Sequence, residues 1–217
     1  MRRTTAKASL YTALNLLFFA LAGTALLALT YDLTHDTIAR SEDLEKLKLI
    51  AQIVPPAAYD NDIMKDTAQL AADEMLGSDE PAIVYRGRLN NQPSVAVIQA
   101  VALGYSGKTS LIIAITRDGR ISGVRVLSHK ETPGLGDYIE IAKSNWITGF
   151  NGASLENPRE SEWKVKKDGG KFDYMAGATI TPRSIVKAVH KALQYYALHR
   201  EELFANEGAR RAVPLPP

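Results

Sequence analysis

The sequence contains no cysteine, and this absence excludes several kinds of redox site at once. Without thiols the chain forms no disulfide, no thiolate zinc site and no iron–sulfur cluster held by its own cysteines. The four histidines do not replace them, because none has a second ligand at metal-binding spacing. The sequence therefore predicts no metal site, and any redox group must be organic or held by other ligands.

An excess of one charge is also missing. The chain has 26 Lys and Arg against 24 Asp and Glu, so its formal charge of +2 gives no reason to expect nucleic-acid binding. No Ser/His/Asp arrangement stands out, which disfavours a soluble hydrolase. Aromatic residues are few, but 46% of the 217 residues are apolar. Length and composition fit one folded domain with an additional segment.

The longest uncharged run lies near the N-terminus, at residues 8–31. As a helix this run spans roughly 36 Å, enough to cross a hydrocarbon core of about 30 Å. Basic residues precede it and acidic residues follow it, so we expect residues 1–7 in the cytoplasm and the folded part outside. A cleaved signal peptide is the alternative, but the run is long for one and no Ala-x-Ala site follows. We expect an uncleaved transmembrane helix.

A membrane-proximal helical segment is expected at residues 32–81. Apolar positions at helical spacing predict a helix over 37–54, which Pro55 and Pro56 end. The acid-rich stretch 57–80 predicts a solvated helix and loops.

From residue 82 the apolar pattern becomes that of strands. Strands are expected at 82–86, 94–103, 110–116, 123–127 and, more briefly, 162–167. Helices are expected at about 137–145 and at 182–204, and the residues 205–217, which carry three prolines, predict a disordered tail. This order indicates an α+β fold with a mainly antiparallel sheet and flanking helices.

The most informative local pattern surrounds Thr179. The small residues 176–178 leave its hydroxyl accessible just before an expected helix, which Thr181 would cap and Pro182 would begin. The N–H groups and dipole at a helix start favour a phosphate beside Thr179. An ordinary Gly-containing turn before a capped helix explains the same residues, and the residues alone leave both readings open.

A second polar loop, residues 128–137, is punctuated by one proline and two glycines between an expected strand and an expected helix. Ligands are commonly contacted by loops that rigid elements position. His129, Lys130 and Glu131 offer a proton shuttle, a cation and a carboxylate. A long turn with solvated charges is the competing interpretation.

Together these features resemble the G subunit of the Rnf electron-transport complex, a membrane-anchored flavoprotein. This subunit is related to the C subunit of the sodium-translocating NADH:quinone oxidoreductase. The resemblance spans nearly the whole chain and rests on the single anchor, residues 129–137, Trp146, and the runs 163–170 and 173–189.

In that family a flavin transferase moves FMN from FAD onto the last Thr of the pattern Asp-x-x-Ser/Thr-Gly-Ala-Thr. Asp173 matches the Asp, Gly177 and Ala178 match the Gly-Ala, and Thr179 matches the acceptor. Ala176 departs from the pattern, because the family usually has Ser or Thr there. The departure removes one hydroxyl beside the acceptor but leaves the acceptor in place.

The resemblance implies an FMN-binding domain at residues 82–204, with FMN joined to Thr179 through a phosphodiester. It places Thr179 as a cofactor anchor rather than a catalytic residue. The other residues expected to contact the cofactor are Asp173, Gly177, Ala178, Thr181, His129, Glu131, Thr132, Gly134 and Leu135. Candidates for an aromatic or apolar wall beside the flavin are Trp146, Trp163, Tyr174 and Met175.

The resemblance further implies an electron-carrying subunit of a translocase or oxidoreductase complex rather than an enzyme alone. Its place would be the bacterial inner membrane, with the FMN domain in the periplasm. Its partners would be the other membrane and redox subunits and, during maturation, the flavin transferase. Two alternatives stay open: the corresponding subunit of a sodium-translocating NADH:quinone oxidoreductase, and a membrane-tethered assembly module without a redox group.

Overall fold

The computed structural model describes residues 2–205, with side chains from Lys7 onward. The chain divides into two compact units at the boundary between Lys46 and Leu47. The predicted disordered tail lies, except for Ala205, outside the described residues.

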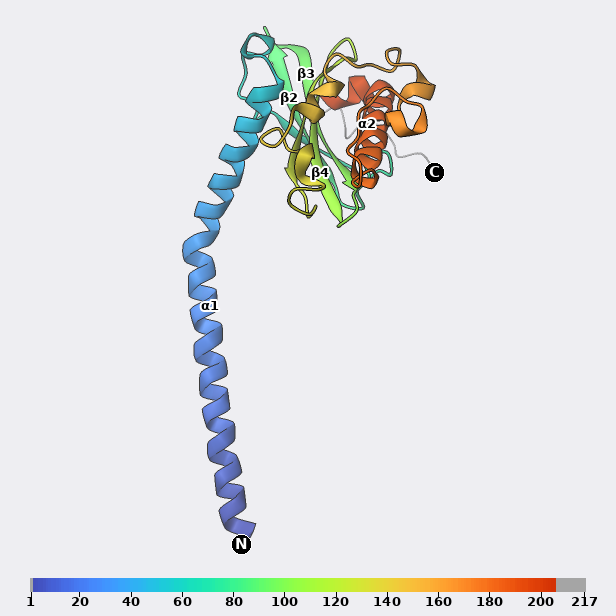
Figure 1. Cartoon of the computed structure of the whole chain (residues 1–217). Coiled ribbons are helices and arrows are strands. Elements are labelled where there is room, and N and C mark those ends of the chain that lie inside the picture. Colours follow the sequence, from blue (N-terminus) through green and yellow to red (C-terminus); the bar gives the residue numbers. More distant parts are fainter. Residues whose placement is uncertain (1, 206–217) are drawn as a thin grey trace, which may run out of the picture. The chain divides into compact units, whose positions relative to one another are not determined.

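The first unit is the greater part of one long helix, α1 (Arg2–Ile53) (Figure 1). Its stretch Lys7–Ile53 is long and apolar enough to cross a membrane, with a mean hydropathy of 2.0 in its most apolar window. Large side chains there are exposed, such as Phe19 at 70% and Leu27 at 73%. The helices predicted at 8–31 and 37–54 are therefore one continuous helix. It ends at Ile53, just before Pro55, as predicted.

The second unit contains a five-stranded antiparallel sheet whose strands lie side by side in chain order. The strands are β1 (Thr67–Leu70), β2 (Ala82–Leu89), β3 (Gln92–Leu103), β4 (Lys108–Thr116) and β5 (Ile121–Ser128). The four strands predicted between 82 and 127 are confirmed as β2 to β5. The sheet also takes in β1, which lies before the boundary predicted at residue 82.

Both faces of the sheet are covered, as its two sets of alternating side chains require. On one face α2 (Ile180–Phe204) packs mainly against β3, and its residues Ile185, Val189 and Leu193 are buried as the helical spacing predicted. On the other face the last turns of α1 contribute Ile50 and Ile53 to a second apolar cluster. The observed fold is the α+β fold that the sequence indicated.

Three local predictions are wrong. Residues 57–80 contain β1 and turns instead of an α-helix. No α-helix forms at 137–145, where the chain makes the 3-10 turns Asp137–Ile139 and Asn145–Phe150. The strand expected at 162–167 is replaced by the 3-10 turns Glu160–Glu162 and Lys166–Asp168, with a single bridge between Val165 and Phe172.

Aromatic packing rather than a hydrogen-bonded ladder organises this last region. The Phe150 and Phe172 rings stack with centroids 4.7 Å apart, and Trp163 lies 5.2 Å from Phe172. Trp163 also stacks on His190 of α2 at 4.7 Å. The segment 145–172 is therefore fixed to α2 without needing regular secondary structure.

A partly buried ion network holds the C-terminal end of α2. Asp66 accepts from Arg86 Nε at 2.5 Å and from Arg88 Nε at 2.7 Å. The two guanidinium groups donate in turn to the carbonyls of Ala205 and Phe204, at 2.9 and 3.1 Å. Cations at a helix C-terminus satisfy its free carbonyls and complement its dipole. The network thereby fixes the helix whose N-terminal end directly follows Thr179.

Candidate functional site

Thr179 occupies the N-cap position, directly before the first residue of α2, and it is half-buried. Its backbone is helical (φ −85°, ψ −22°), and its carbonyl accepts from Arg183 N at 3.3 Å. The hydroxyl makes no capping hydrogen bond, and within residues 2–205 it has no other hydrogen-bond partner. The fold therefore leaves this oxygen available for a bond to a ligand.

The prediction that Thr181 caps the helix is wrong. The helix begins at Ile180, so Thr181 is its second residue, with 1% of its surface exposed. Its Oγ1 accepts from Tyr105 N at 3.4 Å and ties the turn between β3 and β4 to α2. Pro182 is then the third helical residue. It costs no helical hydrogen bond there, because the first N–H groups of a helix have no partner within it.

Two aromatic side chains hold the segment before Thr179. Trp146 Nε1 donates to Asp173 O at 2.7 Å. The Tyr138 hydroxyl accepts from Met175 N at 3.3 Å and donates to Ala178 O at 3.4 Å. The two rings meet edge to face with centroids 5.6 Å apart. Tyr138 is buried, which raises the pKa of its hydroxyl, while the hydrogen bond from Met175 opposes that rise. It therefore stays a donor at neutral pH.

The residues between these anchors form a tight turn that Gly177 makes possible. Ala178 N donates to Met175 O at 3.1 Å, and Gly177 has a φ of +87°. A side chain at this φ would be strained, so glycine suits the position. Apart from Gly177 and its two chain neighbours, no described atom lies within 4 Å of where a Cβ on Gly177 would stand, so this side of the turn is open. A bulky ligand can approach the chain here.

The charged residues near the turn are already paired. Asp173 contacts Lys166 Nζ at 2.5 Å, with both side chains largely exposed. Arg183 donates two hydrogen bonds of 2.5 Å to Asp168. The hydrogen bond to Arg183 lowers the pKa of Asp168. The positive character left at this helix start is consequently that of its N–H groups and dipole.

In the polar loop 128–137, His129 has a structural role. Its Nε2 lies 2.5 Å from Glu140 Oε1, and its Nδ1 accepts from Glu131 N at 3.0 Å. An accepting Nδ1 carries no proton, so this pattern assigns the neutral ring with the proton on Nε2. His129 thus sets the direction in which the chain leaves β5.

Glu131 is buried, with 7% of its surface exposed. Its carboxylate lies between Gly104 and Gly136, where added Cβ atoms would stand only 2.2 and 2.6 Å from its two oxygens. Ser106 N donates to Glu131 Oε1 at 3.3 Å. The two glycines therefore make room for a carboxylate that joins the loop to the turn between β3 and β4.

The tip of the same loop is a compact exposed turn. Leu135 N and Gly136 N both donate to Thr132 O at 3.1 Å, and Gly134 N donates to Asp137 Oδ1 at 2.8 Å. Leu135 is 53% exposed. Thr132, Gly134 and Leu135 thus present a polar and apolar surface to solvent, whereas His129 and Glu131 brace it from within.

Three segments distant in sequence converge on Thr179: residues 104–107, 128–138 and 173–181. The hydrogen bonds of Tyr105, Glu131 and Tyr138 described above join them. Sequence reasoning missed Tyr138 and Tyr105. The signal for Tyr138 was an aromatic residue directly after a glycine-rich polar loop, but its partner segment lies almost forty residues further along.

The four residues expected to form a wall beside the flavin differ in their exposure. Trp163 is 6% exposed and belongs to the core, so it is not available to a ligand. Tyr174 and Met175 are each 39% exposed, and Trp146 is half-buried. Exposed apolar surface near Thr179 in the chain is therefore that of Tyr174 and Met175, and Leu135 adds exposed apolar surface on the polar loop. No base contacts the Thr179 hydroxyl in the described part of the chain, which suits an attachment point rather than a nucleophile in turnover.

Comparison with known proteins assigns this region to a family. Residues 104–194 match the model of the FMN-binding domain, and residues 1–53 match that of the RnfG N-terminal region. The G subunit of the ion-translocating oxidoreductase complex of Pseudomonas aeruginosa is 46% identical over 210 residues, covering 96% of this chain and 98% of that protein. The protein of the same name from Aliivibrio fischeri is 45% identical over 204 residues, covering 94% and 95%.

A more distant likeness is the crystal structure of Shewanella oneidensis NqrC, at 20% sequence identity and a TM-score of 0.47. It covers 70% of this chain and 75% of that one.

Proposed function

This chain belongs to the G subunits of ion-translocating oxidoreductase complexes, and from that membership we propose that it holds FMN covalently on Thr179 and relays single electrons between partner redox subunits. The predicted resemblance to the Rnf G subunit is thereby confirmed. The FMN-binding domain match at residues 104–194 takes in all three segments that converge on Thr179.

The observation that carries the covalent linkage is the unused hydroxyl of Thr179, next to a turn that is held in place yet open on one side. In the attachment step, Thr179 Oγ forms a bond to the FMN phosphorus of FAD and the bond from that phosphorus to the bridging oxygen breaks. AMP leaves, and the hydroxyl proton is released. A flavin transferase performs this step.

The chain's own residues would retain and orient the FMN. The N–H groups and dipole at the start of α2 stabilise the single negative charge of the phosphodiester. Tyr138 and Trp146 fix the turn that leads to Thr179, and the exposed Tyr174, Met175 and Leu135 supply apolar surface near it. The bound flavin supplies the electron-transfer chemistry, and its surroundings tune the potential.

Membrane anchoring comes from the apolar helix α1, the one candidate span among the described residues, together with membership in a membrane complex family. For the orientation, Arg2, Arg3 and Lys7 before the apolar run favour a cytoplasmic N-terminus, with the FMN domain in the periplasm of a bacterial inner membrane. Covalent attachment suits that location, because a dissociated flavin would not readily be replaced outside the cytoplasm.

The test is expression of the full chain with a flavin transferase, followed by denaturing electrophoresis. The wild-type band should fluoresce, and Thr179→Val, which keeps the size and removes the hydroxyl, should not. Thr179→Ser restores a hydroxyl and should recover part of the signal. A fluorescent Thr179→Val band would place the flavin elsewhere.

Two other functions are separable from this one. A corresponding subunit of a sodium-translocating NADH:quinone oxidoreductase would carry the same chemistry with other partners, and co-purified subunits distinguish it. The curated relatives reported above carry the name of the G subunit. An assembly module without a redox group predicts that Thr179→Val keeps full electron-transfer activity of the membrane complex.

A further inference from the structure

A cavity of about 410 Å³ lies against β5, one of the two edge strands of the sheet. Strand β5 forms one wall, the last turns of α1 another and the turn after Ile139 a third. Most of the lining is apolar: Leu49, Val126, Leu127, Ile141 and Ala142. The polar lining residues are Arg125, Ser128, His129 and Glu140. We call this the Arg125 cavity.

Arg125 is a buried cation without a counter-charge. Only 7% of its surface is exposed. Its Nε donates to Gln52 Oε1 at 2.9 Å and its Nη1 to Val124 O at 2.8 Å, both neutral acceptors. Across residues 7–205 no carboxylate forms an ion pair with it, and Nη2 has no hydrogen-bond partner. Burial lowers the pKa of the guanidinium, but a guanidinium stays charged in proteins. The guanidinium is therefore held by neutral acceptors only, and no carboxylate of the described residues is paired with its charge.

The acid that lines the cavity is engaged elsewhere. Glu140 Oε1 contacts His129 Nε2 at 2.5 Å, and the His129 ring is the neutral tautomer held by Glu131 N. Glu140 is thus committed to positioning the start of the polar loop. A carboxylate that pairs with Arg125 would therefore come from outside the described residues.

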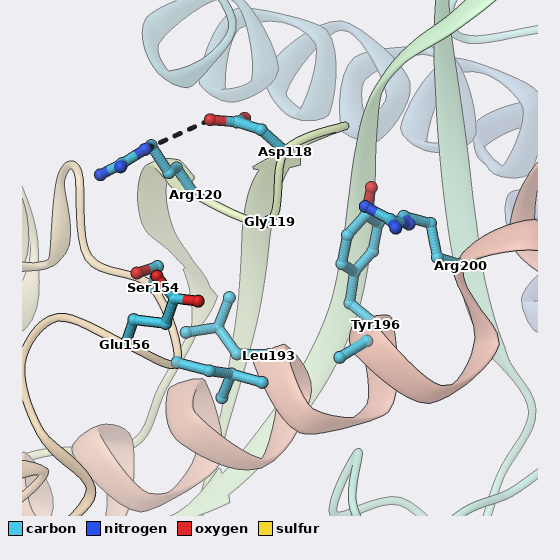
Figure 2. Close-up of a pocket in the computed structure, with 10 residues that line it drawn as sticks. Asp118, Gly119, Arg120, Ser154, Glu156, Leu193, Tyr196 and Arg200 are labelled. Atoms are coloured by element: carbon cyan, nitrogen blue, oxygen red, sulfur yellow. Dashed lines mark ion pairs between the residues drawn. The ribbon is translucent and has the colours of Figure 1, made fainter.

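Other arginines of this unit show the contrast. Arg86 is as buried as Arg125, but Asp66 accepts from its Nε at 2.5 Å. In a second cavity, of about 220 Å³, Arg120 pairs with Asp118 at 3.2 Å (Figure 2). Arg200, which lines the same cavity, is exposed and donates to the carbonyl of Arg117. Neither of these cavity arginines is a buried cation without a partner.

We propose that the Arg125 cavity receives an acidic side chain of a partner subunit, flanked there by apolar residues. A carboxylate matches the free donors of the guanidinium and can accept two parallel hydrogen bonds. The apolar walls of the cavity would contact the apolar residues that flank such an acidic side chain, because the centres of protein interfaces are apolar and contain few charges. Because the family consists of subunits of a larger complex, another subunit of that complex is the expected partner. This inference does not depend on the flavin.

The first test places a photo-cross-linking amino acid at the exposed Ala142 in the full chain, within the assembled complex in its membrane. Irradiation should join this chain to one complex subunit, through a peptide that contains Asp or Glu. The same amino acid at Glu156, which lines the second cavity, is the control for a surface outside the proposed contact. Three results would overturn the proposal. They are a cross-link from position 156 only, a cross-link from Ala142 to a second copy of this chain, and no cross-link from Ala142.

The second test compares Arg125→Met with Arg86→Met. Removing an uncompensated buried charge should leave the thermal midpoint of the isolated full chain unchanged or raised, whereas Arg86→Met should lower it. Affinity for the other subunits should fall roughly thirtyfold or more for Arg125→Met, since breaking a buried interfacial charge pair costs about 2 kcal/mol or more. Covalent flavin should be unchanged. Undiminished co-purification of Arg125→Met would overturn the proposal. The cross-link is made with Arg125 in place, so it decides the question even if this variant does not fold.

Discussion

The Tyr138 hydroxyl should control how quickly flavin becomes attached to Thr179. It is the group that holds both ends of the turn before Thr179, through Met175 N and Ala178 O. Tyr138→Phe removes these two hydrogen bonds and keeps the ring, so the edge-to-face contact with Trp146 persists. The substitution therefore isolates the effect of holding the turn.

The expected magnitude follows from the two bonds. A typical hydrogen bond contributes about 0.5–1.5 kcal/mol net to stability. The distances of 3.3 and 3.4 Å are at the long end, so we take about 0.5–1 kcal/mol for each. Together they stabilise the held turn by about 1–2 kcal/mol, which corresponds to roughly a 5- to 30-fold change in the equilibrium constant between the held and the released turn. If only the held turn is a substrate, the rate of attachment falls, by at most this factor.

The assay is a time course of in-gel flavin fluorescence with purified flavin transferase and FAD. The matched control is Tyr196→Phe, which also removes one buried phenol oxygen. That oxygen has no hydrogen-bond partner among the described residues, so its loss should leave the attachment rate unchanged. Thermal unfolding of both variants checks that the fold is intact. If Tyr138→Phe acquires flavin as fast as the wild type, the turn does not depend on this hydroxyl and the reasoning is refuted.

Three further predictions concern stability. Asp66→Asn removes the counter-charge of the buried Arg86 and should lower the free energy of unfolding, measured in urea, by about 3 kcal/mol. An unchanged urea midpoint would contradict the importance of the network. Burial lowers the pKa of His190 below its ordinary 6.5, so the unfolded state gains a proton first and stability falls as the pH drops through that value. His190→Phe, which keeps a ring on Trp163, should flatten this part of the thermal-unfolding profile, and an unaltered profile would exclude His190 as its source. Burial raises the pKa of Tyr196 to about 12, so stability should decline between pH 10 and 12. Tyr196→Phe should decline less over that range, and an equal decline would argue against this assignment.

The regular part of the fold was predictable because its signals are local. Strands β2 to β5 are long and rich in β-branched residues, and α2 shows a clear apolar stripe. Strand β1 has four residues in an acid-rich stretch, too few for a periodic pattern. Its place depends on pairing with β2, which no local pattern reports.

The irregular regions were predicted wrongly for a related reason. Apolar residues such as Ile139 and Ile147 point into the core, but from 3-10 turns instead of an α-helix. Trp163 and Val165 alternate in burial as in a strand, yet aromatic packing rather than a neighbouring strand fixes them. Burial could be predicted from the residue types, whereas the hydrogen-bond pattern could not.

At the site, the sequence identified the acceptor segment and the polar loop but not how they are joined. Thr181 matches a helix cap in sequence, but its hydroxyl is used by Tyr105, seventy-six residues away. Tyr138 contacts the turn across a gap of 37 to 40 residues. The assignments of Asp173, Gly177, Ala178, His129, Glu131, Thr132, Gly134 and Leu135 as residues that contact the cofactor stay predictions.

The most direct measurement is the mass of the tryptic peptide Phe172–Arg183, taken from the protein isolated from its native membrane. The peptide should be heavier by one FMN less one water, and fragmentation should place the addition on Thr179. An unmodified peptide from flavin-replete membranes, or an addition on another residue, would contradict covalent attachment of the flavin at this hydroxyl.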